Sequence, residues 1–106
     1  MIEVKVKYSV TKGFTEMKIT GHAGFNPGND PVCAGVSALG YALVNTLYNI
    51  EGIEYVKNEV GEHIDIKFIP IQDPMKKIAV NIVFETILIG LKAIQKNYPD
   101  NVKIVQ

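Results

Sequence analysis

The sequence predicts an α+β fold in which a largely antiparallel sheet has two helices packed against it, in the chain order ββαββαβ. Two patterns lead to this prediction. Apolar and polar residues alternate in short segments, as in half-buried strands, and apolar residues recur every three or four positions in two long segments, as in helices. With 106 residues and no linker, repeat or low-complexity segment, the chain is expected to form a single domain over residues 1–106.

A hairpin is predicted at the N-terminus. Residues 2–10 and 14–20 each alternate between apolar and polar side chains, and Lys12-Gly13 between them supplies a tight turn. The glycine-rich segment 21–29 that follows is predicted to be a loop. The side chains expected on the core face are Ile2, Val4, Val6, Tyr8 and Val10 in the first strand and Thr15, Met17 and Ile19 in the second.

Each helix is predicted to begin at an Asp-Pro pair. Asp30-Pro31 and Asp73-Pro74 each place a good N-cap residue before a proline at the first helical position, where a missing N–H costs nothing. The first helix is expected to run to about Ile50 and the second to about Tyr98. Their apolar stripes are expected to be Val32, Val36, Leu39, Leu43, Leu47 and Ile50, and Val80, Phe84, Ile87, Leu91, Ile94 and Tyr98.

A second hairpin is predicted between the helices, and one more strand after them. Residues 53–60 and 63–69 are expected to pair around a turn at Gly61-Glu62. Residues 102–105 are expected to form the last strand. The core face of the second hairpin is expected to include Ile64, Ile66 and Phe68.

The second predicted helix is unusually apolar. Ile78, Ile82 and Ile89 widen its stripe and leave only a narrow polar face. A helix of this kind is covered on more than one side. We therefore expect it to pack against the sheet and the first helix, or against a partner subunit.

Composition and charge exclude several classes of function. Eleven Lys and no Arg balance eleven Asp and Glu, whereas a nucleic-acid binder or a polybasic membrane anchor needs a basic surplus. The N-terminus lacks a signal-peptide pattern, and polar residues interrupt the apolar runs 78–80 and 87–91, so we expect no membrane span and a cytoplasmic protein. The single cysteine excludes an intrachain disulfide and a multi-cysteine metal site, and we expect neither a metal nor a cofactor.

One place in the chain gathers residues capable of chemistry. His22 follows the second strand, and Cys33 lies eleven residues later, at the third position of the first helix if Asp30 is the N-cap. The N–H groups and the positive dipole end of a helix N-terminus favour a thiolate over a thiol. A thiol with a histidine base is the smallest set for nucleophilic acyl transfer, and the N–H groups of Cys33 and a neighbour are candidate donors to an oxyanion.

Each candidate residue also has a purely structural interpretation. Cys33 is suited to be a small core residue, although it lies about 100° from the apolar stripe of its helix. His22 is suited to capping a turn or facing solvent, and Asp30 to helix capping alone. Ser37 is suited to be a polar neighbour one turn beneath the thiol, and His63 to be an exposed strand residue.

Two short motifs resemble those of a known family. Gly21-His22-Ala23-Gly24, a Gly/Asn loop, and then Asp-Pro-Val-Cys-Ala-Gly-Val-Ser over residues 30–37 are similar to the signature of the bacterial ribosomal-processing cysteine proteases, the Prp family. The resemblance covers the whole chain, since the length and the order of elements also agree. It departs from the family pattern at Pro31 and Gly35, where a branched aliphatic residue and an alanine are expected, and in a slightly shorter loop.

The resemblance implies an activity and a site. It implies that His22 and Cys33 form a catalytic dyad supported by Asp30 and Ser37 in a homodimer, while the balanced charge already argues against direct contact with nucleic acid or membrane. It also implies that the enzyme removes the N-terminal extension of a large-subunit ribosomal protein, the twenty-seventh of the L series, and so supports ribosome assembly. The flexible substrate loop would consist of Gly24, Phe25, Asn26, Pro27, Gly28 and Asn29.

We therefore interpret the chain as one cysteine protease domain, a cytoplasmic endopeptidase whose partner is a precursor ribosomal protein. Three alternatives stay open at this point. A non-enzymatic, ribosome-associated binding module would have an inert Cys33. A structural dimerisation domain would owe its apolar second helix to a partner, and a different thiol enzyme such as an amidase would share the dyad.

Overall fold

The computed structural model describes the backbone of residues 1–60 and 63–106 and the side chains of residues 1–58 and 64–106. The predicted turn at Gly61-Glu62 and the interpretation of His63 as an exposed side chain lie outside the described residues. The predicted order ββαββαβ is confirmed. The strands are β1 (Ile2–Ser9), β2 (Gly13–Thr20), β3 (Tyr55–Val60), β4 (His63–Phe68) and β5 (Val102–Val105), and the helices are α1 (Pro31–Tyr48) and α2 (Pro74–Asn97).

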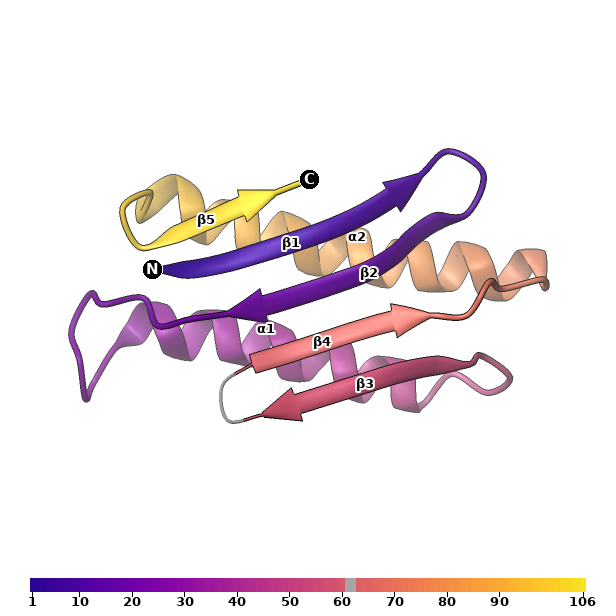
Figure 1. Ribbon diagram of the computed structural model, residues 1–106, viewed down its shortest axis with the longest axis horizontal. Coiled ribbons are helices and arrows are strands. Elements are labelled where there is room, and N and C mark those ends of the chain that lie inside the picture. The colour runs from indigo at the N-terminus through magenta and orange to yellow at the C-terminus, as the bar shows by residue number, and fades with distance from the viewer. Residues whose placement is uncertain (61–62) are drawn as a thin grey trace.

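The strands form one sheet in the order β3-β4-β2-β1-β5. Neighbouring strands are antiparallel except for β1 and β5, which are parallel, so the predicted largely antiparallel sheet is confirmed. Both helices lie on the same side of the sheet (Figure 1). The end of β2, the start of α1 and the turn before β5 lie together at one end of the molecule (Figure 1).

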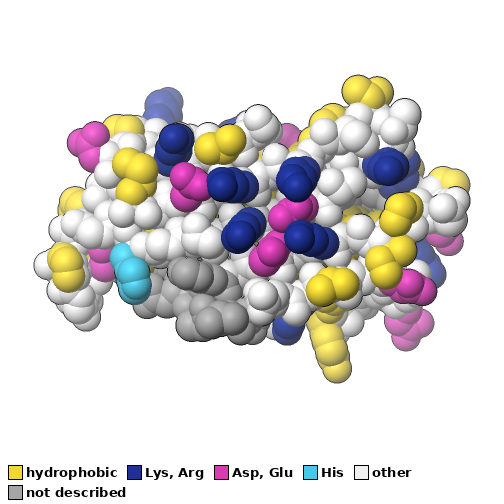
Figure 2. All heavy atoms as spheres, viewed as in Figure 1, with side chains coloured by type: hydrophobic (Ala, Val, Ile, Leu, Met, Phe, Trp, Pro, Cys, Tyr) yellow, Lys and Arg dark blue, Asp and Glu magenta, His cyan; other side chains and the backbone are white. Residues whose placement is uncertain are grey.

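The two faces of the sheet differ in character. The inner face, against the helices, buries apolar residues such as Val4, Met17 and Ile66. The outer face carries lysine and acidic side chains gathered over the strands (Figure 2), among them the Lys7–Glu16 ion pair with an N–O distance of 3.2 Å. This alternation of apolar and charged residues is the pattern that predicted the strands.

The first hairpin departs from the predicted alternation close to its turn. The register shifts after Lys7, so that Tyr8 pairs with Phe14 and Thr15 becomes an extra residue on β2. This β-bulge places Phe14 in the core and leaves Thr15 half-buried. The predicted core positions of Tyr8 and Val10 are wrong, since these side chains are 60% and 93% exposed.

Both helices begin as predicted, at an aspartate cap followed by proline. At the start of α2, Asp73 Oδ1 accepts hydrogen bonds from the N–H groups of Met75 at 2.9 Å and Lys76 at 3.3 Å. Asp30 caps α1 in the same way. The first helix ends at Tyr48, slightly before the predicted position.

The core lies between the inner face of the sheet and the two helices. Leu39 and Ile94 are half-buried at the contact between α1 and α2, where a Cβ on Gly90 would lie 3.0 Å from Leu39 Cδ1. Tyr98, expected in the stripe, is exposed just beyond the end of α2. The confirmed members of the two stripes are Val32, Val36, Leu43 and Leu47 in α1 and Val80, Phe84, Ile87 and Leu91 in α2.

Part of the apolar surface of α2 is uncovered. Met75, Ile78, Ile82 and Ile89 are 54% to 74% exposed, so the sheet and α1 cover only one side of this helix. By length and hydropathy α1 and α2 both qualify as membrane spans, as core helices of soluble proteins often do. Length and hydropathy alone do not show that either helix crosses a membrane, so the expectation of no membrane span stays a prediction.

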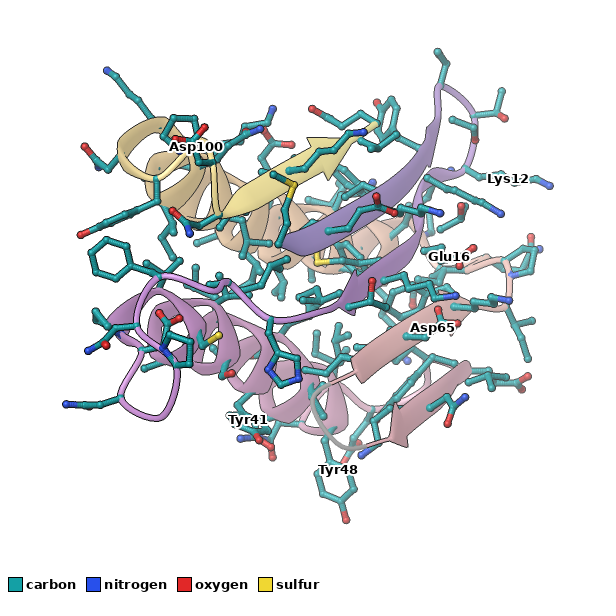
Figure 3. All side chains as sticks on the ribbon, turned by 60° about the vertical axis from the view of Figure 1, so that its left-hand side comes forward. Lys12, Glu16, Tyr41, Tyr48, Asp65 and Asp100 are labelled. Carbon is teal, nitrogen blue, oxygen red and sulfur yellow. The ribbon has the colours of Figure 1, made fainter. Side chains whose placement is uncertain are left out.

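Replacing Asp73 with Ala is expected to lower the free energy of unfolding by about 1 kcal/mol, because the first-turn N–H groups of α2 lose their acceptor. Urea unfolding followed by circular dichroism measures this change. Asp100→Ala is the control, since it removes a carboxylate from the turn before β5 (Figure 3) that caps no helix. Equal unfolding free energies for the two variants would contradict the prediction.

Candidate active site

The predicted reactive residues lie at the end of the molecule where β2 stops and α1 starts (Figure 1). Cys33 is the third residue of α1, as predicted, and its side chain is half-buried. The backbone N–H of Ala23 donates a hydrogen bond to Cys33 Sγ at 3.2 Å. His22 is exposed, and it lines the same cavity of about 310 Å³ as Cys33. The fold therefore brings a thiol and an imidazole to one small cavity.

The hydrogen bond from Ala23 matters for the chemistry of the sulfur. A backbone N–H directed at sulfur places partial positive charge against the atom that becomes negative in a thiolate. Ala23 is 2% exposed, so the peptide N–H is shielded from water. The N-terminal end of α1 contributes a second positive potential at the same atom. Both effects stabilise negative charge on Cys33 Sγ.

The Asp30 carboxylate connects the loop to the helix. Its Oδ1 accepts hydrogen bonds from the N–H groups of Val32 at 2.9 Å and Cys33 at 3.2 Å, and its Oδ2 accepts from Phe25 at 2.9 Å and Asn26 at 3.2 Å. Desolvation raises the pKa of this carboxyl, but the four N–H donors outweigh it and hold the pKa below its ordinary value. Asp30 therefore orders the loop as well as capping α1.

The Asp30 carboxylate also occupies a group that was expected to bind an oxyanion. The N–H of Cys33, a predicted oxyanion donor, already donates to Asp30 Oδ1. The N–H of Ala23 donates to the sulfur. Neither group stands free in this structure, so an oxyanion at the Cys33 N–H has to compete with Asp30.

The predicted substrate loop, residues 24–29, is exposed along its whole length. Within it, the N–H of Asn29 donates to the carbonyl of Asn26 at 3.1 Å. The ring of Phe25 packs edge-on against Tyr98 beyond α2, with centroids 5.1 Å apart. Three loop residues line the cavity that holds the thiol: Gly24, Pro27 and Gly28. The backbone angle φ is positive at Gly24 (69°) and Gly28 (91°), a conformation that favours glycine.

Two further residues of α1, Ser37 and Gly35, do not line the cavity. Ser37, one turn after Cys33, is half-buried and is not among the residues that line the cavity. Gly35 faces α2 instead, where a Cβ would lie 3.3 Å from Ile94 Cδ1. Glycine suits this tight helix contact, at a position where alanine was expected.

Sequence reasoning missed one residue at the site. Asn101, in the turn between α2 and β5, donates a hydrogen bond from Nδ2 to the carbonyl oxygen of Ala23 at 2.8 Å. The two residues are 78 positions apart in the chain, and neither segment carries a motif that signals the contact. The contact follows from the pairing of β5 with β1, which brings the C-terminal turn to the end of β2.

Size alone does not identify the site. A larger cavity, of about 390 Å³, lies at the other end of the sheet, beside the β1–β2 turn and the segment after β4 (Figure 1). Its lining contains no cysteine or histidine, so of these two cavities only the smaller is equipped for thiol chemistry. Over the residues that the structure describes, no three His, Cys, Asp or Glu side chains gather in a group that could hold a metal ion.

These features define a class of protein. A half-buried thiol at a helix N-terminus, hydrogen-bonded by a backbone N–H and sharing a cavity with an imidazole, is the arrangement of a thiol-dependent acyl-transfer enzyme. The chain belongs to the cysteine protease Prp family, whose model matches residues 1–103.

Individual relatives agree with this membership. The chain is 31% identical to the ribosomal processing cysteine protease Prp of Bacillus subtilis (strain 168), over 98% of this chain and 96% of the relative. It is 33% identical to that of Mycoplasma genitalium, over 93% of each. Its fold matches a crystal structure of the essential ribosomal processing protease Prp from S. aureus in complex with a covalently linked product peptide, with a TM-score of 0.85 and 25% identity over 98% of this chain and 97% of that one.

The resemblance seen in the motifs is therefore confirmed, and the protein is a cysteine protease. Membership in an enzyme family excludes a non-enzymatic binding module and a purely structural dimerisation domain as descriptions of this chain.

Replacing Asp30 with Asn is expected to loosen the loop while α1 stays folded. The side-chain carbonyl of Asn still accepts from the first turn of α1, whereas its amide group cannot accept from Phe25 and Asn26. Hydrogen exchange of these two loop amides is expected to rise at least about threefold. NMR-detected exchange measures this, and unchanged loop amides would contradict the prediction.

Lowering the pH tests the same carboxylate in the unaltered protein. Because the pKa of Asp30 is lowered on folding, its hydrogen bonds are fully present above the ordinary value of 3.8 and are lost as the pH falls through the lowered pKa. The amide chemical shifts of Phe25 and Asn26 are therefore expected to be constant near neutral pH and to change only below that value. The Asp30→Asn variant should show no such step.

Proposed function

We propose that this protein is a ribosomal-processing endopeptidase that removes the N-terminal extension of a large-subunit ribosomal protein, number twenty-seven of the L series. The observation that carries the proposal is the presence of Cys33 and His22 in one cavity at the start of α1, in a chain of the cysteine protease Prp family. Relatives named as ribosomal processing proteases support the substrate class.

Cys33 is the nucleophile and His22 is its base. His22 takes the thiol proton, and Sγ attacks the scissile carbonyl carbon to form a C–S bond. When the tetrahedral intermediate collapses, the C–N bond breaks and His22 gives the proton to the leaving amine, which leaves a thioester. The covalently linked product peptide on the S. aureus relative supports a covalent step of this kind.

Water completes the reaction. His22 takes a proton from the water as its oxygen attacks the thioester carbon. The C–S bond then breaks, which regenerates a thiolate beside an imidazolium. The new C-terminus of the released peptide ionises to a carboxylate.

The groups around the dyad prepare the sulfur and shape the cleft. The N–H of Ala23 stabilises negative charge on Sγ. Asp30 holds the start of the loop, and Ser37 supports Cys33 from the next turn of α1. Residues 24–29 act as a flexible lid whose glycines let it adapt to the substrate.

We further propose that the enzyme is a cytoplasmic homodimer that uses the exposed face of α2. Ile78, Ile82 and Ile89 are exposed on a helix whose other side lies in the core. Covering this face with the same face of a second copy removes apolar surface from water. No direct contact with nucleic acid or membrane is part of the proposal, since the net charge of the chain is zero.

Incubation with the precursor ribosomal protein is expected to yield one clipped N-terminus, detected by intact mass spectrometry. Cys33→Ala is expected to abolish clipping, because no nucleophile remains. His22→Ala is expected to slow it by about 10²- to 10⁴-fold, because the base is lost.

His63→Ala, which removes the other histidine of the chain, tests whether the loss is specific to His22. Clipping by Cys33→Ala at the wild-type rate would overturn the assignment of the nucleophile. No clipping by the wild type, together with a thiol inert to iodoacetamide, would overturn the proposed function.

Replacing Ile82 with Glu is expected to convert a homodimer into a monomer, because a carboxylate would be buried in the apolar contact. Size-exclusion chromatography with light scattering measures the mass. Val10→Glu is the control, since Val10 is 93% exposed and lies in the β1–β2 turn. A dimer that survives Ile82→Glu would place the interface elsewhere.

A further inference from the structure

Ala23 is held from two sides by side chains. Its N–H donates to Cys33 Sγ at 3.2 Å, and its carbonyl oxygen accepts from Asn101 Nδ2 at 2.8 Å. The residue is 2% exposed and lies between His22 and the substrate loop. The orientation of this one residue therefore affects the sulfur, the neighbouring imidazole and the point where the loop begins.

Asn101 is itself firmly placed. Its N–H donates to the carbonyl of Tyr98 at 3.0 Å, and its carbonyl accepts from the N–H of Ile2 at 2.9 Å. The next residue, Val102, pairs with Ile2 in the parallel β1–β5 ladder. Positive φ occurs only at glycines among the described residues, so the backbone of Asn101 tolerates alanine without strain.

We propose that Asn101 is a positioning residue for the thiol. Its amide holds the carbonyl of Ala23 and thereby directs the N–H of Ala23 at Cys33 Sγ. Asn101 acts through Ala23 rather than on the substrate. The inference rests on the proposed role of Cys33 as the nucleophile.

The physical reason lies in the two peptide planes that meet at Ala23. The N–H belongs to the plane before this residue and the carbonyl to the plane after it, so a hydrogen bond on each fixes both backbone torsions. Without the Asn101 amide, the carbonyl of the buried residue Ala23 loses its donor and the second plane is free to turn. Because the two planes join at the Cα of Ala23, movement of this residue then also turns the N–H away from Cys33 Sγ. The N–H···S contact weakens, since hydrogen bonds depend steeply on angle.

A change in thiol reactivity on substitution of Asn101 can be traced to this contact. The titratable groups that line the cavity with Cys33 are His22 and Asp30. The loop of residues 24–29 contains no charged residue. Asn101→Ala removes no charge, so the electrostatic surroundings of the sulfur otherwise stay the same.

The test compares Asn101→Ala and Asn101→Asp with Asn97→Ala. Asn97 is the matched control, because its Nδ2 also donates to a backbone carbonyl, that of Ala93 at 3.1 Å, but on the exposed end of α2. Three quantities are measured for each variant: kcat/KM on a peptide spanning the precursor cleavage site, the pH midpoint of Cys33 alkylation by iodoacetamide, and the melting temperature.

Asn101→Ala is expected to lower kcat/KM roughly 5- to 10-fold, the effect of one lost hydrogen bond. It is also expected to raise the pH midpoint of alkylation, because the thiolate loses a donor. Asn101→Asp is expected to be more severe, since it sets a carboxylate oxygen against the Ala23 carbonyl. Asn97→Ala is expected to match the wild type in both quantities.

Two results would overturn the inference. One is a kcat/KM and an alkylation midpoint in Asn101→Ala equal to those of Asn97→Ala. The other is a lower melting temperature with an unchanged midpoint, which would make Asn101 a residue of the fold alone. The Cys33→Ala variant separates failure of this inference from failure of the proposed function. If Cys33→Ala still cleaves, the assignment of the nucleophile fails. If Cys33→Ala is inactive and the Asn101 variants are unaffected, only the positioning role of Asn101 fails.

Discussion

The Asp30 carboxylate is the acceptor on which the rest of the site depends. A helix N-terminus leaves N–H groups without partners, and here one side chain satisfies those of α1 with one oxygen and those of the loop with the other. The loop therefore ends where the helix begins, and Cys33 takes a defined position between them. This cap also occupies the N–H of Cys33, the group predicted from the sequence to donate to an oxyanion.

The sheet determines which distant segments reach this end of the molecule. β2 ends at the site because it pairs with β1, and the turn before β5 arrives there because β5 runs parallel to β1. The thiol thus lies where a strand end, a helix start and the C-terminal turn meet (Figure 1). The buried core lies behind them, and the exposed loop lies in front.

The sequence was enough to predict most of the fold and part of the site. Local rules predict the roles of Asp30, Pro31 and Cys33 at the start of α1. A helix cap, a proline at the first position and the third helical residue are each determined by neighbouring residues in the chain. The hairpin error at Tyr8 and Val10 has a different origin. A bulge is one extra residue in a pairing between two strands, and strict alternation within one strand carries no sign of it.

By itself, the sequence determined the class of the fold, the order of its elements, the two helix starts and the His22–Cys33 pair as the chemical candidates. Only the tertiary structure decided that Ala23 donates to the sulfur, that Asn101 holds Ala23, and that one side of α2 is left uncovered. The physical reason is the distance along the chain over which each interaction acts. Capping and periodicity act over a few residues and leave a pattern in the chain, whereas contacts between residues 78 positions apart arise from strand pairing and packing of the whole domain.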